Sequence, residues 1–251
     1  VILLGYQFMG GGLLGIYGIA MATIGMTAMK GMMQSIDTFG PISDNAAGIA
    51  EMSGTSKETR KSLDVLDAAG NVTKAITKGY GLTKCVLSSI VMLFAYIFVL
   101  IRYQGITMND FSDIALYLNL ANPHIIVALL IGATIPFLFS ALLLRATSRA
   151  ASKMVDEVRR QFKEISGLLS GDEKPDYSRC IDISTRNSLK EMVLPVMIGM
   201  VAPLIIGFTL GVWPLAAFQI GITIMGALLA VFMFNSGGAW DNAKKYIEAG
   251  H

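Results

Sequence analysis

Long apolar stretches alternate with polar ones along the chain. Mostly apolar segments cover about 11–36, 82–101, 124–144, 191–211 and 214–236. A helix of roughly 20 apolar residues crosses the hydrocarbon core of a bilayer, which is about 30 Å thick. The pattern therefore predicts an all-α, polytopic transmembrane helix bundle with about five spans.

Two polar stretches, about 37–80 and 145–190, separate these spans, whereas the connection 102–122 is short and nearly uncharged. Charged residues, Glu157 among them, keep helical spacing on polar faces from Arg145 to Lys163, which predicts that the third span continues as a helix beyond the membrane. Two glycines, Gly167 and Gly171, are expected to end this extension. We interpret residues 1–251 as a single transmembrane domain with long cytoplasmic helix extensions.

Composition and charge agree with a membrane protein. Hydrophobic residues make up 53% of the chain and charged residues only 15%, which excludes an ordinary soluble domain. If the two polar stretches and the C-terminal end share one side, all of the 20 Lys and Arg except Lys30 and Arg102 lie at that side. The positive-inside rule makes it the cytoplasmic side. These positive charges do not alternate with aromatic residues, so we expect no nucleic-acid partner.

The first polar cluster follows the first span. Asp44, Gly48 and Glu51 have the spacing i, i+4, i+7, so on a helix they share one face with a glycine between two carboxylates. Such a face can line a polar cavity. It can equally be the solvated end of a helix near a membrane surface.

The second cluster lies before the second span. Asp67, Asn71, Lys74 and Lys78 have the spacing i, i+4, i+7, i+11 and again share a helical face. Carboxylate and amide oxygens are ligands that suit magnesium, and ammonium groups bind phosphate. The alternative is a surface ladder of ion pairs.

The third cluster follows the last span. Asp241, Lys244, Lys245 and Glu248 have the spacing i, i+3, i+4, i+7 and share a helical face. The alternative is that the paired lysines are a membrane anchor, which is common at the end of a span. All three clusters reach the same membrane face in the predicted topology, so carboxylates, amides and lysines would converge there. Such a site suits a magnesium-bound diphosphate, whose remaining charge lysines can neutralise.

Three segments carry a resemblance to a known family. GPISDNAAGIAEM at 40–52, LDAAGNVTKAITKG at 66–79 and GGAWDNAKKYIEAG at 237–250 resemble the membrane-bound, ion-translocating inorganic pyrophosphatases, in that family's order. The resemblance implies a homodimer of sixteen-helix subunits, of which this chain is similar to the end of the tenth helix through the fifteenth. It also implies pyrophosphate as substrate, Mg²⁺ as cofactor and the lipid bilayer as surroundings.

The resemblance also implies roles for individual residues. By position in the family's motifs, Asp44, Asn71 and Asp241 are expected to be magnesium ligands, and Lys244 and Lys245 are expected to hold pyrophosphate.

A further pair of residues bears on potassium. Lys74 with Thr77 resembles the potassium-independent subclass, in which the lysine ammonium replaces a bound potassium ion, and this favours protons as the transported ion. Lys78 lies in the shared motif, and with Glu51 and Asp67 it completes the candidate residues.

The chain also departs from the family pattern. The carboxylates that activate water in the family stand on helices without a counterpart here, so we assign no catalytic residue and expect the chain alone to be inactive. Its apolar start is expected to be a cut in a longer protein, and Ala47 stands where a glycine is common. Lys30, seven residues before Asp37, is an ammonium within a predicted span, which requires a partner, a water path or snorkelling to the membrane edge.

Two other functions stay open. A secondary transporter or channel subunit could use the same acidic and lysine faces to carry ions without hydrolysis. A non-catalytic scaffold segment of a membrane complex is the third interpretation.

Overall fold

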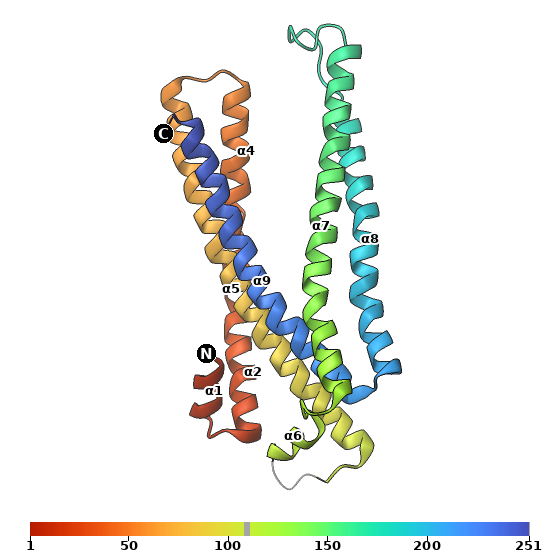
Figure 1. Cartoon of the computed structure of the whole chain (residues 1–251). Coiled ribbons are helices and arrows are strands. Elements are labelled where there is room, and N and C mark those ends of the chain that lie inside the picture. The colour runs from red at the N-terminus through yellow and green to blue at the C-terminus, as the bar shows by residue number, and fades with distance from the viewer. Residues whose placement is uncertain (108–110, 251) are drawn as a thin grey trace. The chain divides into compact units, whose positions relative to one another are not determined.

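The computed structural model describes residues 1–107 and 111–250, and within these ranges all regular elements are helices (Figure 1). The all-α prediction is confirmed. In chain order the elements are α1 (Ile2–Phe8), α2 (Gly12–Ala28), α3 (Lys30–Asp37), α4 (Phe39–Met52), α5 (Lys57–Gln104), η1 (Phe111–Asp113), α6 (Ile114–Tyr117), α7 (Pro123–Glu164), α8 (Tyr177–Thr209) and α9 (Val212–Glu248).

The predicted number of spans is confirmed, but the first span is not one straight helix. Helices α5, α7, α8 and α9 are each long and apolar enough to cross a membrane, and α2 with α3–α4 forms a fifth candidate that bends by 47°. The hydroxyls of Thr23 and Thr27 donate to carbonyls four residues earlier, a pattern that often bends helices. The break falls at Met29, and Lys30 begins α3 directly after it.

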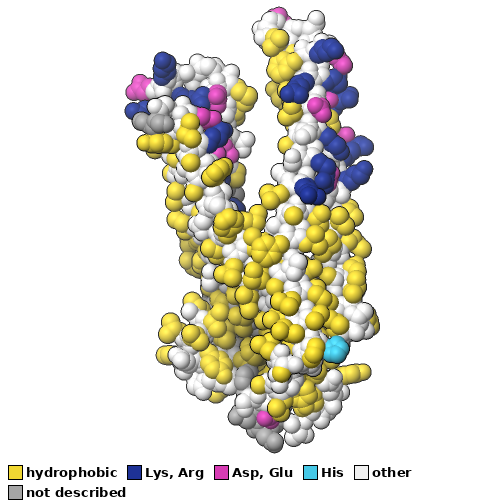
Figure 2. Space-filling view, in the orientation of Figure 1, with side chains coloured by type: hydrophobic (Ala, Val, Ile, Leu, Met, Phe, Trp, Pro, Cys, Tyr) yellow, Lys and Arg dark blue, Asp and Glu magenta, His cyan; other side chains and the backbone are white. Residues whose placement is uncertain are grey.

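The described residues form two compact units. Unit 1 combines residues 1–119 with 223–251, and unit 2 comprises residues 120–222, so that α9 begins in unit 2 and continues into unit 1. On the face that Figure 2 shows, Lys and Arg side chains of each unit gather at one end and apolar side chains cover much of the rest. Only 11–22% of the apolar windows of the long helices is buried, so most of this surface is available to lipid or to further protein.

Helix α5 carries both a polar cluster and a span. It begins after Ser56, whose hydroxyl accepts a hydrogen bond from the backbone N–H of Thr59, with Glu58 in the first turn. It ends at Gly105, whose φ of 65° lies in the left-handed region. Because the helix runs unbroken for 48 residues, its polar first half is positioned directly by its apolar second half.

The predicted extension of the third span is confirmed in unit 2. Helix α7 continues from its apolar segment to Glu164, and a turn returns the chain to α8 (Figure 1). Gly167 and Gly171 in this turn have φ values of 90° and 83°, which residues with a side chain rarely adopt.

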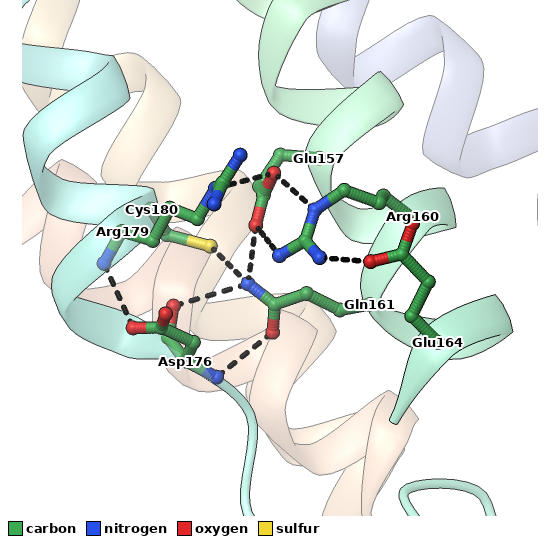
Figure 3. Close-up of polar contacts among 7 residues, drawn as sticks. All are labelled: Glu157, Arg160, Gln161, Glu164, Asp176, Arg179 and Cys180. Atoms are coloured by element: carbon green, nitrogen blue, oxygen red, sulfur yellow. Dashed lines mark hydrogen bonds and ion pairs between the residues drawn. The ribbon is translucent and has the colours of Figure 1, made fainter. Parts of the chain in front are cut away.

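A buried carboxylate joins the end of α7 to the start of α8 (Figure 3). Glu157 is 5% exposed and accepts hydrogen bonds from Arg160 at 2.9 and 2.7 Å, from Gln161 at 2.9 Å and from Arg179 at 3.1 Å. The Gln161 amide also pairs with both backbone groups of Asp176. Glu157 lies beyond the apolar segment, and the hydrogen bonds from Arg160 and then Gln161 lower its pKa to about 2. Spacing had placed Glu157 on a polar face, whereas in the fold it is the centre of a network that holds the hairpin closed.

Two glycines allow α7 and the first turns of α9 to cross closely within unit 2. A Cβ at Gly132 would clash with the carbonyl oxygen of Phe218, and a Cβ at Gly221 would clash with that of Leu129. Phe218 itself is 1% exposed. Small residues at such crossings let membrane helices pack backbone to backbone.

Replacing Gly132 with alanine is expected to lower the free energy of unfolding by about 1–3 kcal/mol, the usual cost of overpacking. Thermal unfolding of the full-length protein in detergent measures the effect. Gly199→Ala on α8 is the matched control, because a Cβ there meets nothing within 4 Å. Equal melting temperatures for the two variants would contradict the crossing.

Candidate functional site

The candidate site lies in unit 1 along one face of α5. Asp67, Asn71, Lys74 and Lys78 all make contacts from this face, as their spacing predicts. Asp67 and Asn71 are 1% and 3% exposed, so this is no solvated ladder of ion pairs. The partners of this face come from α3, α4 and α9.

Helix α9 is bound to α5 by a compact set of polar contacts. The Asn71 amide nitrogen donates to Asp241 Oδ2 at 2.6 Å and to Asn242 Oδ1 at 2.9 Å. Lys245 forms an ion pair with Asp67 and a second with Asp241 at 3.0 Å. The second and third sequence clusters are therefore in direct contact.

The two carboxylate oxygens of Asp67 differ in their contacts. Its Oδ2 pairs with Lys245, but its Oδ1 is buried without a hydrogen-bond partner among the described residues. A buried carboxylate is costly unless it is paired, so the Lys245 ammonium is what permits Asp67 to be there. The free Oδ1 keeps the capacity to accept a further hydrogen bond or to contact a cation.

Helix α4 approaches α5 through glycines. Lys74 Nζ donates to Asn71 Oδ1 at 3.2 Å and lies 3.8 Å from Asp44 Oδ2. The aliphatic part of Lys74 lies against Gly40, where any Cβ would clash with it. A Cβ on Gly70 would stand 3.1 Å from the Gly40 Cα. The close approach of α4 and α5 thus depends on these two glycines and directs Lys74 toward Asn71 and Asp44.

The end of α3 contributes a carboxylate to the same face. Asp37 Oδ1 accepts hydrogen bonds from the Thr77 hydroxyl at 2.6 Å and from Lys78 Nζ at 3.2 Å. Asp37 and Lys78 also line a pocket of about 290 Å³ whose wall includes Lys30 and Lys84. Lys30 therefore borders a pocket that contains a carboxylate.

Two candidate residues lie apart from these contacts. Glu51 pairs with Arg60 at 3.1 Å and its side chain is 63% exposed. Lys244 pairs with Glu248 at 3.5 Å and is similarly exposed. Glu51 is on the predicted face of α4, but it stands at the end of that helix, beside the turn into α5.

Sequence reasoning missed two polar residues of this site. Asn242 accepts from Asn71 and donates to the carbonyl of Ala68 at 3.4 Å, yet nothing in its spacing distinguishes it. Asp37 could have been found, because it precedes Asp44 by seven residues, which is two helical turns.

Burial and ion pairing have opposite effects on the pKa values of Asp241 and Lys245, which lie beyond the apolar segment of α9. Burial acts to raise the pKa of Asp241, but hydrogen bonds from Lys245 and Asn71 bring it below its ordinary value. Burial acts to lower the pKa of Lys245, but its pairs with Asp67 and Asp241 raise it. Both groups are therefore charged at neutral pH.

The expected magnesium ligands lie along one continuous path. Asp44 contacts Lys74, Lys74 contacts Asn71, and Asn71 contacts Asp241. Their oxygens suit a hard divalent cation, but Asn71 turns its nitrogen toward Asp241, so its amide must rotate before both oxygens can bind one ion. Across residues 1–107 and 111–250, no group of three or more Asp, Glu, His or Cys is placed to hold a metal. The roles of Asp44, Asn71 and Asp241 as magnesium ligands stay a prediction.

A pocket of about 410 Å³ opens beside this path between α5 and α9. Its wall includes Asn71, Asn235, Gly238 and Asn242. The three amides give this pocket polar groups that can donate and accept hydrogen bonds.

Comparison with known proteins gives consistent matches. A family model described as inorganic H⁺ pyrophosphatase matches residues 1–251. A K(+)-insensitive pyrophosphate-energized proton pump of Chloroflexus aurantiacus is 46% identical over 239 residues, which cover 94% of this chain and 31% of the relative. A protein of the same name from Methanosarcina mazei is 42% identical over 253 residues, covering 100% of this chain and 36% of the relative.

A relative named as a pump for another ion has about the same sequence identity to this chain. A K(+)-stimulated pyrophosphate-energized sodium pump of Thermotoga maritima is 45% identical over 237 residues, 94% of this chain and 32% of the relative. The chain thus spans about a third of the length of the curated relatives it matches. Overall identity does not separate the two kinds of pump, so the distinction must rest on single residues.

Replacing Asp67 with alanine is expected to lower the free energy of unfolding by on the order of 2–3 kcal/mol. This is less than the cost of breaking a fully buried pair, because Lys245 keeps its ion pair with Asp241 in the variant. Thermal unfolding of the full-length protein measures it. Asp64→Ala on the same helix is the control, since its exposed pair with Arg60 is worth at most about 1 kcal/mol. A larger loss for the control would refute the assigned role of Asp67.

Proposed function

Because the chain belongs to the inorganic H⁺ pyrophosphatase family, we propose that the full protein containing it couples hydrolysis of magnesium-bound pyrophosphate to proton transport across a membrane. The observation that carries this proposal is the convergence of α4, α5 and α9 on one polar face. Oxygens of Asp44, Asn71 and Asp241 and ammonium groups of Lys74 and Lys245 meet there. Oxygens for a metal beside cations for an anion are what a metal-chelated diphosphate requires.

The oxygen-bearing side chains and the lysines of the site would have different roles. Asp44, Asn71 and Asp241 would hold magnesium, which when bound supplies neutralisation of the phosphate oxygens and makes phosphorus easier to attack. Lys245, released from Asp241, would bind an oxygen of pyrophosphate, and Lys244 at the same helix end would bind another. The groups that activate water are expected elsewhere in the full protein.

We further propose that this protein needs no potassium. Lys74 places a tethered ammonium group between Asn71 Oδ1 and Asp44 Oδ2, where a monovalent cation could otherwise bind. Thr77, one turn further along α5, is 6% exposed and belongs to the same packed face. The proposal rests on these two positions, because potassium-insensitive and potassium-stimulated relatives are equally similar to the chain.

The chain is an integral membrane segment, and we propose that its polar face is cytoplasmic. The supporting argument is the positive-inside rule applied to the gathered lysines and arginines. The homodimer implied by the resemblance stays a prediction. A secondary transporter or channel finds no support in the relatives, which are named as pyrophosphate-energized pumps.

Vesicles containing the full-length protein are expected to release phosphate and acidify their lumen when magnesium and pyrophosphate are added without potassium. Colorimetric phosphate release and quenching of a pH-sensitive dye measure the two processes. Asp241→Ala is expected to abolish both, because a metal ligand is lost. Asp182→Asn, at an exposed pair with Arg186 in unit 2, is the control. Inert wild-type vesicles would favour a transporter, and active Asp241→Ala with unchanged magnesium dependence would remove that residue from the site.

Replacing Lys74 with alanine is expected to make hydrolysis respond to potassium, because the tethered positive charge is gone. Wild-type protein should show the same rate with potassium or with an impermeant organic cation at equal ionic strength. Phosphate release over a potassium titration measures the response. A flat titration for the variant would show that Lys74 does not replace potassium.

A further inference from the structure

Two lysines stand one turn apart on the same face of α5. Lys74 and Lys78 are spaced i, i+4, where like charges repel each other. Each has a different carboxylate: Lys74 lies 3.8 Å from Asp44, and Lys78 donates to Asp37 at 3.2 Å. Asp37 and Asp44, seven residues apart, thus each pair with one of the two ammonium groups.

The Thr77 hydroxyl has three acceptors within reach. It lies 2.6 Å from Asp37 Oδ1, 3.0 Å from the carbonyl of Thr73 and 3.2 Å from that of Lys74. A hydroxyl has one proton to donate, and the charged and nearest acceptor is favoured. Asp37 therefore fixes the rotamer of Thr77 as well as the direction of Lys78.

Lys74 has little freedom once its neighbours are fixed. Its aliphatic part lies in the space that Gly40 leaves open, and its ammonium is directed to Asn71 Oδ1. Electrostatic competition from Lys78 could draw Asp44 away from it, because the two lysines share a face.

We propose that Asp37 is a positioning residue that sets the cation requirement of the site by holding Lys78 and Thr77, so that Lys74 alone occupies the position beside Asn71 and Asp44. This inference rests on the proposed function. Without the charge of Asp37, the ammonium groups of Lys74 and Lys78 compete for Asp44, and Lys74 is displaced from Asn71. The site then loses its tethered cation without any change at Lys74 itself.

A double-mutant cycle in the full-length protein tests this proposal. Asp37→Asn retains an oxygen that can accept from Thr77 but lacks the charge that holds Lys78. We expect it to lower kcat/KM for magnesium pyrophosphate without potassium about tenfold. In the Lys74→Ala background, measured with saturating potassium, the same substitution should cost less than about twofold, because there is no longer a lysine to displace. A residue that only supports the fold would cost the same factor in both backgrounds.

Controls separate the outcomes. Asp64→Asn, at an exposed ion pair on the same helix, should leave kcat/KM unchanged in both backgrounds. If Asp37→Asn does not accumulate as folded protein, Asp37→Glu, which keeps the charge but shifts it by one methylene, enters the same cycle with a smaller expected loss. Equal losses with and without Lys74 would overturn the role of Asp37 while leaving the proposed function intact. Wild-type protein that hydrolyses no pyrophosphate, or only with potassium, would overturn both.

Discussion

The pairing of Lys245 with Asp67 is the interaction on which the geometry of the site depends. Asp67 is buried inside α5, and the ammonium that offsets its charge comes from α9. The same ammonium contacts Asp241, which in turn accepts from Asn71. One lysine thus fixes the register between two long helices, and α4 completes the face through Asp44 and Lys74. The polar groups are positioned by each other and by the apolar halves of the same helices.

Much of this arrangement could be predicted from the sequence, because helical periodicity alone decides which residues share a face. The contacts of Asp67, Asn71, Lys74 and Lys78 follow from their spacing along a continuous α5. The extension of α7 to Glu164 follows from the charged residues that keep helical spacing beyond its apolar segment. Both predictions depend only on the spacing of residues within a single helix.

Features that depend on how helices approach each other could not be predicted in this way. The contact of Gly40 with Lys74 exists because two backbones come close, and no spacing rule shows which glycine lies at a crossing. Asn242 enters the site through that same kind of approach. Glu157 was placed on a polar face by spacing, yet α8 brings Arg179 to it and buries it. Roles for Asp44, Asn71 and Asp241 as metal ligands came only from resemblance and stay predictions.

The pairing of charges within the site has a consequence for how a ligand binds. Asp241 and Lys245 satisfy each other, so a cation alone must displace an ammonium, and an anion alone must displace a carboxylate. In the proposed site, a divalent cation and a diphosphate that arrive together would avoid both penalties, because the metal would take the Asp241 oxygen while the released Lys245 would take a phosphate oxygen. Binding of either ligand would then strengthen binding of the other, which is positive coupling between two ligands at one site. Under the proposed function, the ion pair would therefore favour the metal-bound diphosphate over free magnesium or free pyrophosphate.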